Sequence, residues 1–160
     1  MPVQAGVVEA RSCHLWRAVC HMKHIKNLLE EPFDEDYYIQ QFKDIDENTY
    51  NAQWIPIVHE TQEIGFLIIC THPNCHPDAD WYIENAYIIP EYQNQGHMQR
   101  AVQNWLKEHP GRYCLFIIDK NYPARHMWET VFKKAGYIPF KLKHVIPQKK
   151  GVTQYGWQRR

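Results

Sequence analysis

Residues 88–98 read IIPEYQNQGHM, and this stretch decides how the chain is expected to fold. An apolar strand runs into a polar turn that contains Gly96, and the turn runs into a helix. Backbone N–H groups at the start of a helix lack partners within it and point outward with the positive end of the helix dipole. Because glycine lets a ligand approach the main chain closely, the stretch predicts a site for the phosphates of a cofactor.

Two common phosphate motifs do not match this turn. No Gly-Lys-Ser/Thr follows it, as a Walker loop requires, and it has only one of the three glycines of G-x-G-x-x-G. The spacing Gln93-x-x-Gly96-x-Met98 instead resembles the Arg/Gln-x-x-Gly-x-Gly/Ala loop with which the GNAT acetyltransferases hold the pyrophosphate of acetyl-coenzyme A. Met98 stands where that family prefers Gly or Ala, so its side chain either turns away from the diphosphate or loosens the grip.

The segments around the turn have the order strand, helix, strand. Residues 81–89 are rich in aromatic and β-branched side chains and stop at Pro90, which is typical of a strand. Apolar residues recur at three- and four-residue spacing from Met98 to Leu106, which predicts a helix that stops at 109–111. Residues 113–118 form an apolar run typical of a strand covered on both faces. This order predicts a βαβ unit with the turn at the carboxyl end of its first strand, where open sheets bind ligands.

A further helix is predicted from Asn121, a suitable N-cap, to Gly136, which fits the left-handed position that closes a helix. The segment from Asn121-x-x-Ala124 through Trp128 to Gly136-Tyr137 resembles the second GNAT signature, an Asn-x-x-Ala helix that ends in Gly-Phe or Gly-Tyr. The helix is about one turn longer than in the commonest form of the family.

That extra turn affects the expected chemistry. In the family, a tyrosine of this helix is credited with protonating the departing thiolate, and its position here holds Trp128 or Phe132. Neither ring can donate a phenolic proton, which leaves Tyr137, Tyr122 or water for the role. Cys70 and Cys114 lie in apolar strands, where a thiol tends to stay neutral, and are weaker candidates for a nucleophile.

The amino-terminal half is expected to supply the rest of the fold. Residues 3–10 are predicted as a first strand, 14–29 as a helix and 35–45 as a second, short helix. Residues 54–58 and 64–69 are predicted as an antiparallel hairpin. Pro56 lies inside the first of these strands, which favours an edge position or a bulge.

Length and composition predict a single domain over residues 1–160. The chain has 160 residues, enough to bury roughly 70% of its unfolded surface. Its 44% hydrophobic and 22% charged residues are ordinary for a globular protein, and its 14% aromatic residues supply large core side chains. The 18 basic and 18 acidic residues balance, which excludes a general electrostatic field for nucleic acid or a membrane surface.

No stretch has the pattern of a signal peptide or the length of a transmembrane helix, so a cytoplasmic location is expected. The five cysteines are odd in number and irregular in spacing, and they are expected to be reduced thiols. Residues 72–78 and residues 13–24 both contain Cys and His, yet neither offers the paired ligands of a zinc site. No bound metal is expected, and the loop at 72–78 is expected to border the entrance for the acceptor. The first helices, the loop at 72–80 and the carboxy-terminal strands are expected to line the acceptor's pocket.

An acceptor amine with a pKa near ~10 is protonated at neutral pH, so its acetylation needs a base. Glu84 is the best candidate, since strand alternation puts it on one face with Ala86 and Ile88, in apolar surroundings that would raise its pKa. In the GNAT family a glutamate of this strand often serves as the base. The alternative role is a carboxylate that only binds the acceptor's ammonium or pairs with a basic group elsewhere.

The resemblance also implies the cofactor contacts. A backbone N–H near Tyr87 or Ile88 would bind the thioester carbonyl, the amides from Gln95 to Arg100 would hold the diphosphate, and Asn121 would meet the pantetheine arm. The expected catalytic residues are Glu84 and Tyr137. The expected cofactor-binding residues are Tyr87, Ile88, Ile89, Gln93, Gln95, Gly96, His97, Met98, Gln99, Arg100, Asn121, Ala124 and Trp128.

The resemblance thus implies an α/β fold with a GNAT-like mixed sheet of six or seven strands, splayed at its middle and flanked by about four helices. The implied activity is an N-acetyltransferase that moves the acetyl group of acetyl-CoA to a primary amine by direct attack. One alternative is an acyl-CoA sensor without catalysis. Another is a toxin-like enzyme that acetylates aminoacyl-tRNA, for which the carboxy-terminal lysines and arginines offer a modest basic patch. The expected partners are acetyl-CoA and an amine acceptor. The final strand at 153–159 is expected to be exposed and could pair with its copy in a homodimer.

Overall fold

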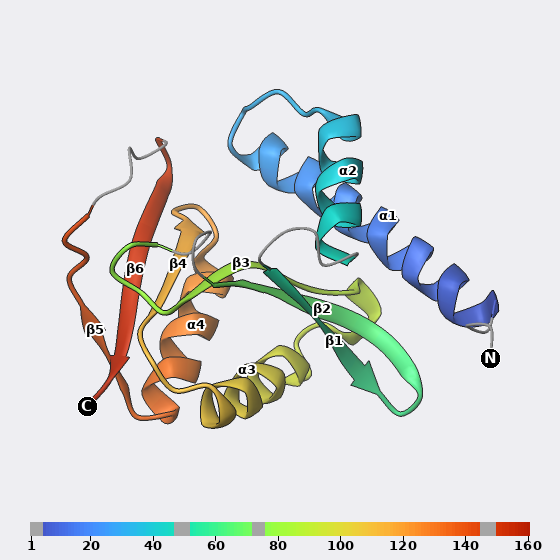
Figure 1. Cartoon of the computed structure of the whole chain (residues 1–160). Coiled ribbons are helices and arrows are strands. Elements are labelled where there is room, and N and C mark those ends of the chain that lie inside the picture. Colours follow the sequence, from blue (N-terminus) through green and yellow to red (C-terminus); the bar gives the residue numbers. More distant parts are fainter. Residues whose placement is uncertain (1–4, 47–51, 72–75, 145–149) are drawn as a thin grey trace.

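The computed structural model describes residues 5–46, 52–71, 76–144 and 150–160 (Figure 1). Within these ranges it has four α-helices, a short 3₁₀ helix and six strands. In chain order they are α1 (Ala5–Leu28), α2 (Glu35–Asp46), β1 (Ala52–His59), β2 (Gln62–Cys70), β3 (Trp81–Ile88), η1 (Pro90–Tyr92), α3 (His97–Glu108), β4 (Tyr113–Ile118), α4 (Tyr122–Lys134), β5 (Tyr137–Phe140) and β6 (Val152–Arg159).

The strands form one mixed sheet in the order β1-β2-β3-β4-β6-β5. The pair β3–β4 is parallel and α3 connects its strands, which confirms the predicted βαβ unit. The other neighbours are antiparallel. Figure 1 shows α1 and α2 together on one side of the sheet, and α3 and α4 on the other. The α/β class with a six-stranded mixed sheet and four helices is as predicted.

The two middle strands separate soon after they meet. β3 pairs with β4 only where residues 81–83 lie beside residues 113–115, although β3 continues to Ile88 and β4 to Ile118. On its other edge β3 stays paired with β2, with one irregularity: Ile83 faces Ile69 and Asn85 faces Ile68, so Glu84 is an extra residue. Such a β-bulge bends its strand and increases the local twist. The sheet is therefore splayed at its centre.

Each face of the sheet has its own apolar core. Under α3 and α4, buried residues from all six strands and both helices form the larger core, with Leu67, Leu106, Leu115 and Phe132 at its centre. Under α1 and α2, the smaller core contains Val19, Phe42, Phe66 and Ile68. The alternation of Phe66, Leu67 and Ile68 between the two cores explains why β2 is buried on both faces.

The prediction of a first strand over residues 3–10 is wrong, because residues 5–10 already belong to α1. Val7 and Val8 favour a strand, but good helix formers such as Ala5, Glu9 and Ala10 surround them. Residues 3 and 4 lie outside the described ranges. The helix predicted at 35–45 and the hairpin are confirmed, and Pro56 does lie on an edge strand, β1.

The prediction that the final strand is exposed and could pair across a dimer is also wrong. β6 lies inside the sheet, hydrogen-bonded to β4 on one edge and to β5 on the other. Both of its edges are occupied, so the outer strands of this sheet are β1 and β5. The apolar residues Tyr155 and Trp157, which suggested an interface, pack against the larger core instead.

The larger core should dominate stability. Phe132 of α4 is fully buried, and its ring stacks on Trp157 with the two ring centroids 5.1 Å apart. We expect Phe132→Ala to lower the free energy of unfolding by about 3–5 kcal/mol, because it leaves a cavity that the surrounding rings cannot close. Tyr122→Ala, at a 70% exposed ring of the same helix, should change it by less than about 0.5 kcal/mol. Urea unfolding followed by circular dichroism measures both; equal losses would contradict this account of the core.

Candidate active site

A cleft of about 450 Å³ opens where β3 and β4 separate. Its lining comes from α1 and α2 on one face of the sheet, from β3, β4 and β6, and from the start of α4 on the other face. Of the residues predicted from the sequence, it brings together Glu84, Asn121, Ala124 and Trp128. The cleft therefore passes through the splayed sheet and connects its two faces.

The Glu84 carboxylate lies in this cleft, and two neighbours hold it in place. The Gln41 side chain of α2 donates a hydrogen bond to Glu84 Oε1 (Nε2–Oε1 3.1 Å). The Cys70 thiol of β2 donates to the other oxygen (Sγ–Oε2 2.8 Å). Burial raises the pKa of Glu84, and the thiol hydrogen bond opposes part of that rise. A carboxylate with a raised pKa in a cleft is well suited to accept a proton.

The prediction that Glu84 shares a face with Ala86 and Ile88 is wrong. Ala86 and Ile88 pack into the core under α3 and α4, whereas Glu84 contacts Gln41 and Cys70 on the side of α1 and α2. The cause is the bulge, which adds one residue to β3 at Glu84 and so breaks the simple alternation of side chains.

The Gly96 turn stands at the carboxyl end of β3, as predicted. Gly96 is the N-cap of α3 with φ 80°, a left-handed conformation that favours glycine, and it offers no side-chain cap to the first helical amides. The Arg100 guanidinium folds back over the turn and donates to the Gln95 carbonyl (Nη2–O 3.1 Å). The turn thus combines the outward N–H groups of His97, Met98 and Gln99 with a positive side chain.

His97 itself adds no positive charge at this turn. Its ring lies 4.8 Å from that of His59, centroid to centroid, and its Nδ1 is 3.1 Å from Arg100 Nη2. Desolvation and the neighbouring Arg100 and His59 lower the pKa of His97, so the imidazole is neutral near pH 7. Met98, which stands where the family prefers Gly or Ala, packs against the core under α3 and α4. Its side chain therefore turns away from the loop, which is the first of the two outcomes expected for it.

Gln93 and Gln95 brace the segment that leads to the helix. Gln93 Nε2 donates to the Ile88 carbonyl (2.8 Å), and Gln95 Nε2 donates to the Glu91 carbonyl (3.2 Å). The amide of Ile89 bonds to Ile64 of β2, so strand alternation directs the N–H and C=O of Ile88 to the opposite edge, toward the gap left by β4. Of the two amides proposed to meet a thioester carbonyl, that of Ile88 faces the gap, and that of Tyr87 faces β2.

The start of α4 is built as predicted. Asn121 Oδ1 accepts a hydrogen bond from the Ala124 amide (3.2 Å), which makes Asn121 the N-cap, and Gly136 has φ 82° beyond the helix end. Trp128 lines the cleft and is buried. The structure does not bring Tyr137 there: its ring lies in the core against Phe132, centroids 5.5 Å apart. Tyr122 is 70% exposed and does not line the cleft.

The first helices were expected to line the acceptor's pocket, and they do, but the individual residues that α2 brings to the site were not identified from the sequence. Tyr37, Tyr38, Gln41 and Phe42 line the cleft and face the Glu84 side of β3. The spacing of 38 and 42 marks one helical face, but no sequence pattern says that this face covers a cleft rather than a core. The described part of the loop expected at the acceptor entrance, residues 76–78, does not line the cleft; residues 72–75 lie outside the described ranges.

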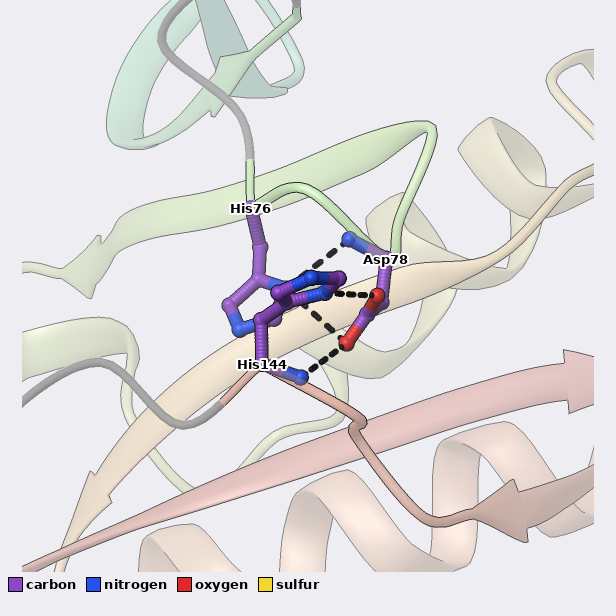
Figure 2. A network of polar contacts seen from close by, with 3 residues as sticks. All are labelled: His76, Asp78 and His144. Atoms are coloured by element: carbon purple, nitrogen blue, oxygen red, sulfur yellow. Dashed lines mark hydrogen bonds and ion pairs between the residues drawn. The ribbon is translucent and has the colours of Figure 1, made fainter.

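That loop takes part in a separate polar network (Figure 2). Asp78 accepts hydrogen bonds from the His144 amide and from His144 Nδ1, both at 2.7 Å, and its own amide donates to His76 Nδ1 (3.1 Å). The hydrogen bonds from His144 hold the pKa of Asp78 at about 2. The network ties the segment before β3 to the segment after β5. Within the described residues, no group of three or more His, Cys, Asp or Glu side chains could hold a metal ion.

Comparison with known proteins gives a consistent result. The sequence pattern of the acetyltransferase (GNAT) family matches residues 21–132, which is more than half of the chain. No protein of curated function matches the sequence. None of the helices in the described ranges is long and apolar enough to cross a bilayer.

Several solved structures share the fold at low sequence identity. An acetyltransferase from Thermus thermophilus superposes with a TM-score of 0.61 at 13% identity, over 89% of this chain and 87% of that one. A GNAT-family acetyltransferase from Staphylococcus aureus gives 0.55 at 14% identity, over 99% and 96%. Tetrahymena GCN5 gives 0.53 at 14% identity, over 88% and 86%. At these identities the likeness concerns the fold alone.

The raised pKa of Glu84 predicts a pH-dependent stability difference. At a pH between the pKa of Glu84 in the unfolded chain and its higher pKa in the folded protein, Glu84 holds a proton in the folded state that it has lost in the unfolded chain. The stability that this bound proton contributes is fully present below the pKa of Glu84 in the unfolded chain. It is lost as the pH rises through the pKa of Glu84 in the folded protein. Glu84→Gln stays neutral, so the Tm of this variant relative to that of the wild type should rise between pH 4 and pH 8.

Scanning calorimetry at both pH values measures the change. Glu108→Gln, at an exposed residue near the end of α3, controls for the loss of one charge. A Glu84→Gln difference that is the same at pH 4 and pH 8 would show that burial does not penalise the Glu84 carboxylate.

Proposed function

The chain belongs to the acetyltransferase (GNAT) family and is an acyltransferase, and from this premise we propose that it transfers the acetyl group of acetyl-CoA to a primary amine by direct attack. One observation carries the proposal. A single cleft runs through the splayed sheet, with the Glu84 carboxylate toward α1 and α2 and the start of α4 on the other side. An amine and a thioester entering from opposite faces would meet between β3 and β4.

In this proposal the Gly96 turn holds the diphosphate of acetyl-CoA. The amides of the first turn of α3 and the Arg100 guanidinium supply hydrogen bonds and positive charge where the phosphates would bind. The pantetheine arm would pass between the strands toward Asn121, Ala124 and Trp128. The Ile88 amide would donate to the thioester carbonyl and stabilise the negative charge that develops on its oxygen.

Glu84 serves as the base. It takes a proton from the acceptor's ammonium, and the nitrogen lone pair then attacks the carbonyl carbon of the thioester. A C–N bond forms, the attacking nitrogen gives up its second proton to water in the cleft, the C–S bond breaks, and the sulfur leaves as the thiolate of coenzyme A. Tyr137 lies in the core beyond Phe132 and Trp128, and Tyr122 does not line the cleft. Water that enters the open cleft therefore supplies the proton to the thiolate, while Glu84 returns its proton to solvent.

Substitutions at Gly96 test the cofactor site. Gly96→Asp places a carboxylate against the diphosphate and should weaken acetyl-CoA binding at least about 100-fold, because two like charges meet at short range. Gly96→Asn has the same shape without the charge and should lose much less. Gly136→Asp controls for an aspartate at a left-handed position: its φ of 82° is close to the 80° of Gly96, and a Cβ there would have open space, whereas a Cβ at Gly96 would lie 2.8 Å from Arg100 Nη1.

Calorimetric titration with acetyl-CoA measures these affinities. Wild-type protein and Gly136→Asp should bind alike. If Gly96→Asp binds as tightly as wild type, or if wild type does not bind acetyl-CoA, the Gly96 turn is only a helix start.

Removal of the base tests the chemistry. Glu84→Gln should lower kcat about 10²- to 10⁴-fold and leave the dissociation constant of acetyl-CoA within about twofold of wild type. The wild-type rate should rise with pH as Glu84 loses its proton, at a pH above the ordinary range of a glutamate because burial raises its pKa. The variant should lack this rise. Release of free thiol with a panel of amines measures both profiles; a higher KM with unchanged kcat would assign Glu84 to ammonium binding instead.

A further inference from the structure

Large apolar side chains line much of the acceptor half of the cleft, beside polar side chains such as those of Gln41 and Asn85. The acceptor half is the part of the cleft formed by α1 and the adjoining Leu29, by α2, and by the facing residues of β3 and β4. Its large apolar side chains are Ile25, Leu29, Tyr38, Phe42, Tyr82 and Phe116. The Tyr82 and Phe116 rings meet edge to face, with centroids 5.5 Å apart, and the Tyr37 ring contacts that of Tyr38 in the same way at 5.1 Å. These surfaces suit a hydrocarbon or aromatic body.

Few charged side chains line this half. Of its two basic residues, Lys26 is paired with an acidic side chain and His21 is uncharged near pH 7. Lys26 lines the cleft, but its ammonium lies 2.6 Å from Glu31 Oε2. Burial lowers the pKa of His21 to about 4, so its imidazole is neutral near pH 7. Among the described residues, Glu84 is the only carboxylate that lines the cleft.

Among the side chains that the structure describes, no cation pairs with the Glu84 carboxylate. Its hydrogen bonds come from the neutral Gln41 amide and the Cys70 thiol, and no basic side chain among the described residues perturbs it. Each carboxylate oxygen can accept a further hydrogen bond. A partly buried carboxylate without a cation is costly, and an incoming ammonium would relieve that cost.

Building on the proposed function, we propose that the acceptor is a monoamine whose single ammonium is attached to an apolar, preferably aromatic, body and which has no anionic group. The ammonium meets Glu84, and the body lies between the α2 rings and Tyr82. An α-carboxylate or phosphate beside the amine would face Glu84, and the described lining of the cleft has no unmatched cation to receive it. A second ammonium would find no second carboxylate in the described lining. The structure thus disfavours amino acids, phosphorylated amines and polyamines.

Matched acceptors test this inference on the full chain with acetyl-CoA. Phenylalanine is phenethylamine with an added α-carboxylate, and 1,5-diaminopentane is pentylamine with an added ammonium. We expect kcat/KM for phenethylamine to exceed that for phenylalanine at least about 100-fold, and kcat/KM for pentylamine to exceed that for the diamine at least about tenfold.

The inference is overturned if phenylalanine or the diamine is acetylated as well as its matched monoamine. It is also overturned if a protein that binds acetyl-CoA acetylates neither monoamine. Failure to bind acetyl-CoA in the calorimetric titration is a separate result, because it removes the proposed function itself.

One pair of variants tests where the acceptor's body lies. Tyr37 lines the cleft and is 58% exposed, so Tyr37→Ala should fold and should raise KM for phenethylamine about two- to tenfold with kcat unchanged. Trp16→Ala is the control, since Trp16 is 53% exposed on α1 and does not line the cleft. Equal KM values for Tyr37→Ala and Trp16→Ala would contradict the placement of the body against α2.

Discussion

The separation of β3 from β4 after three residue pairs is the constraint on which the site depends. A strand that loses a neighbour exposes backbone groups that need other partners. In β3, side chains supply some of these: Asn85 Oδ1 accepts the Ala86 amide at 3.0 Å, and Gln93 donates to the Ile88 carbonyl at 2.8 Å. Because β2 stays paired along the other edge, β3 keeps its place while the gap beside it stays open.

The bulge at Glu84 adds the chemistry to that gap. It turns the carboxylate toward α1 and α2, while Ala86 and Ile88 remain with the core under α3 and α4. In the proposed reaction, the base therefore meets the amine on one face of the sheet, and the amide of Ile88 meets the thioester at the opening itself. Burial of this carboxylate reduces stability at neutral pH, which is a common cost of a functional group held in apolar surroundings.

The sequence was sufficient for the elements with strong local signals. The β3–α3–β4 unit, the Asn121 cap and the left-handed Gly136 follow from apolar periodicity and from turn chemistry, and the structure has all of them. Long-range pairing could not be predicted in the same way. The place of β6 between β4 and β5, the bulge at Glu84 and the approach of Gln41 to that carboxylate depend on contacts between segments far apart in the chain. The first strand was mispredicted because two adjacent valines outweighed their helix-forming neighbours.

The central claim is that acetyl-CoA enters the gap between β3 and β4, and backbone amide NMR during titration with acetyl-CoA tests it most directly. The account predicts that the largest shifts fall on Ile88, on residues 96–100 and on residues 121–128, on both sides of the gap. Shifts confined to residues 78–80, Lys141 and Lys143, which line a separate hollow near the Asp78 and His144 network, would contradict it.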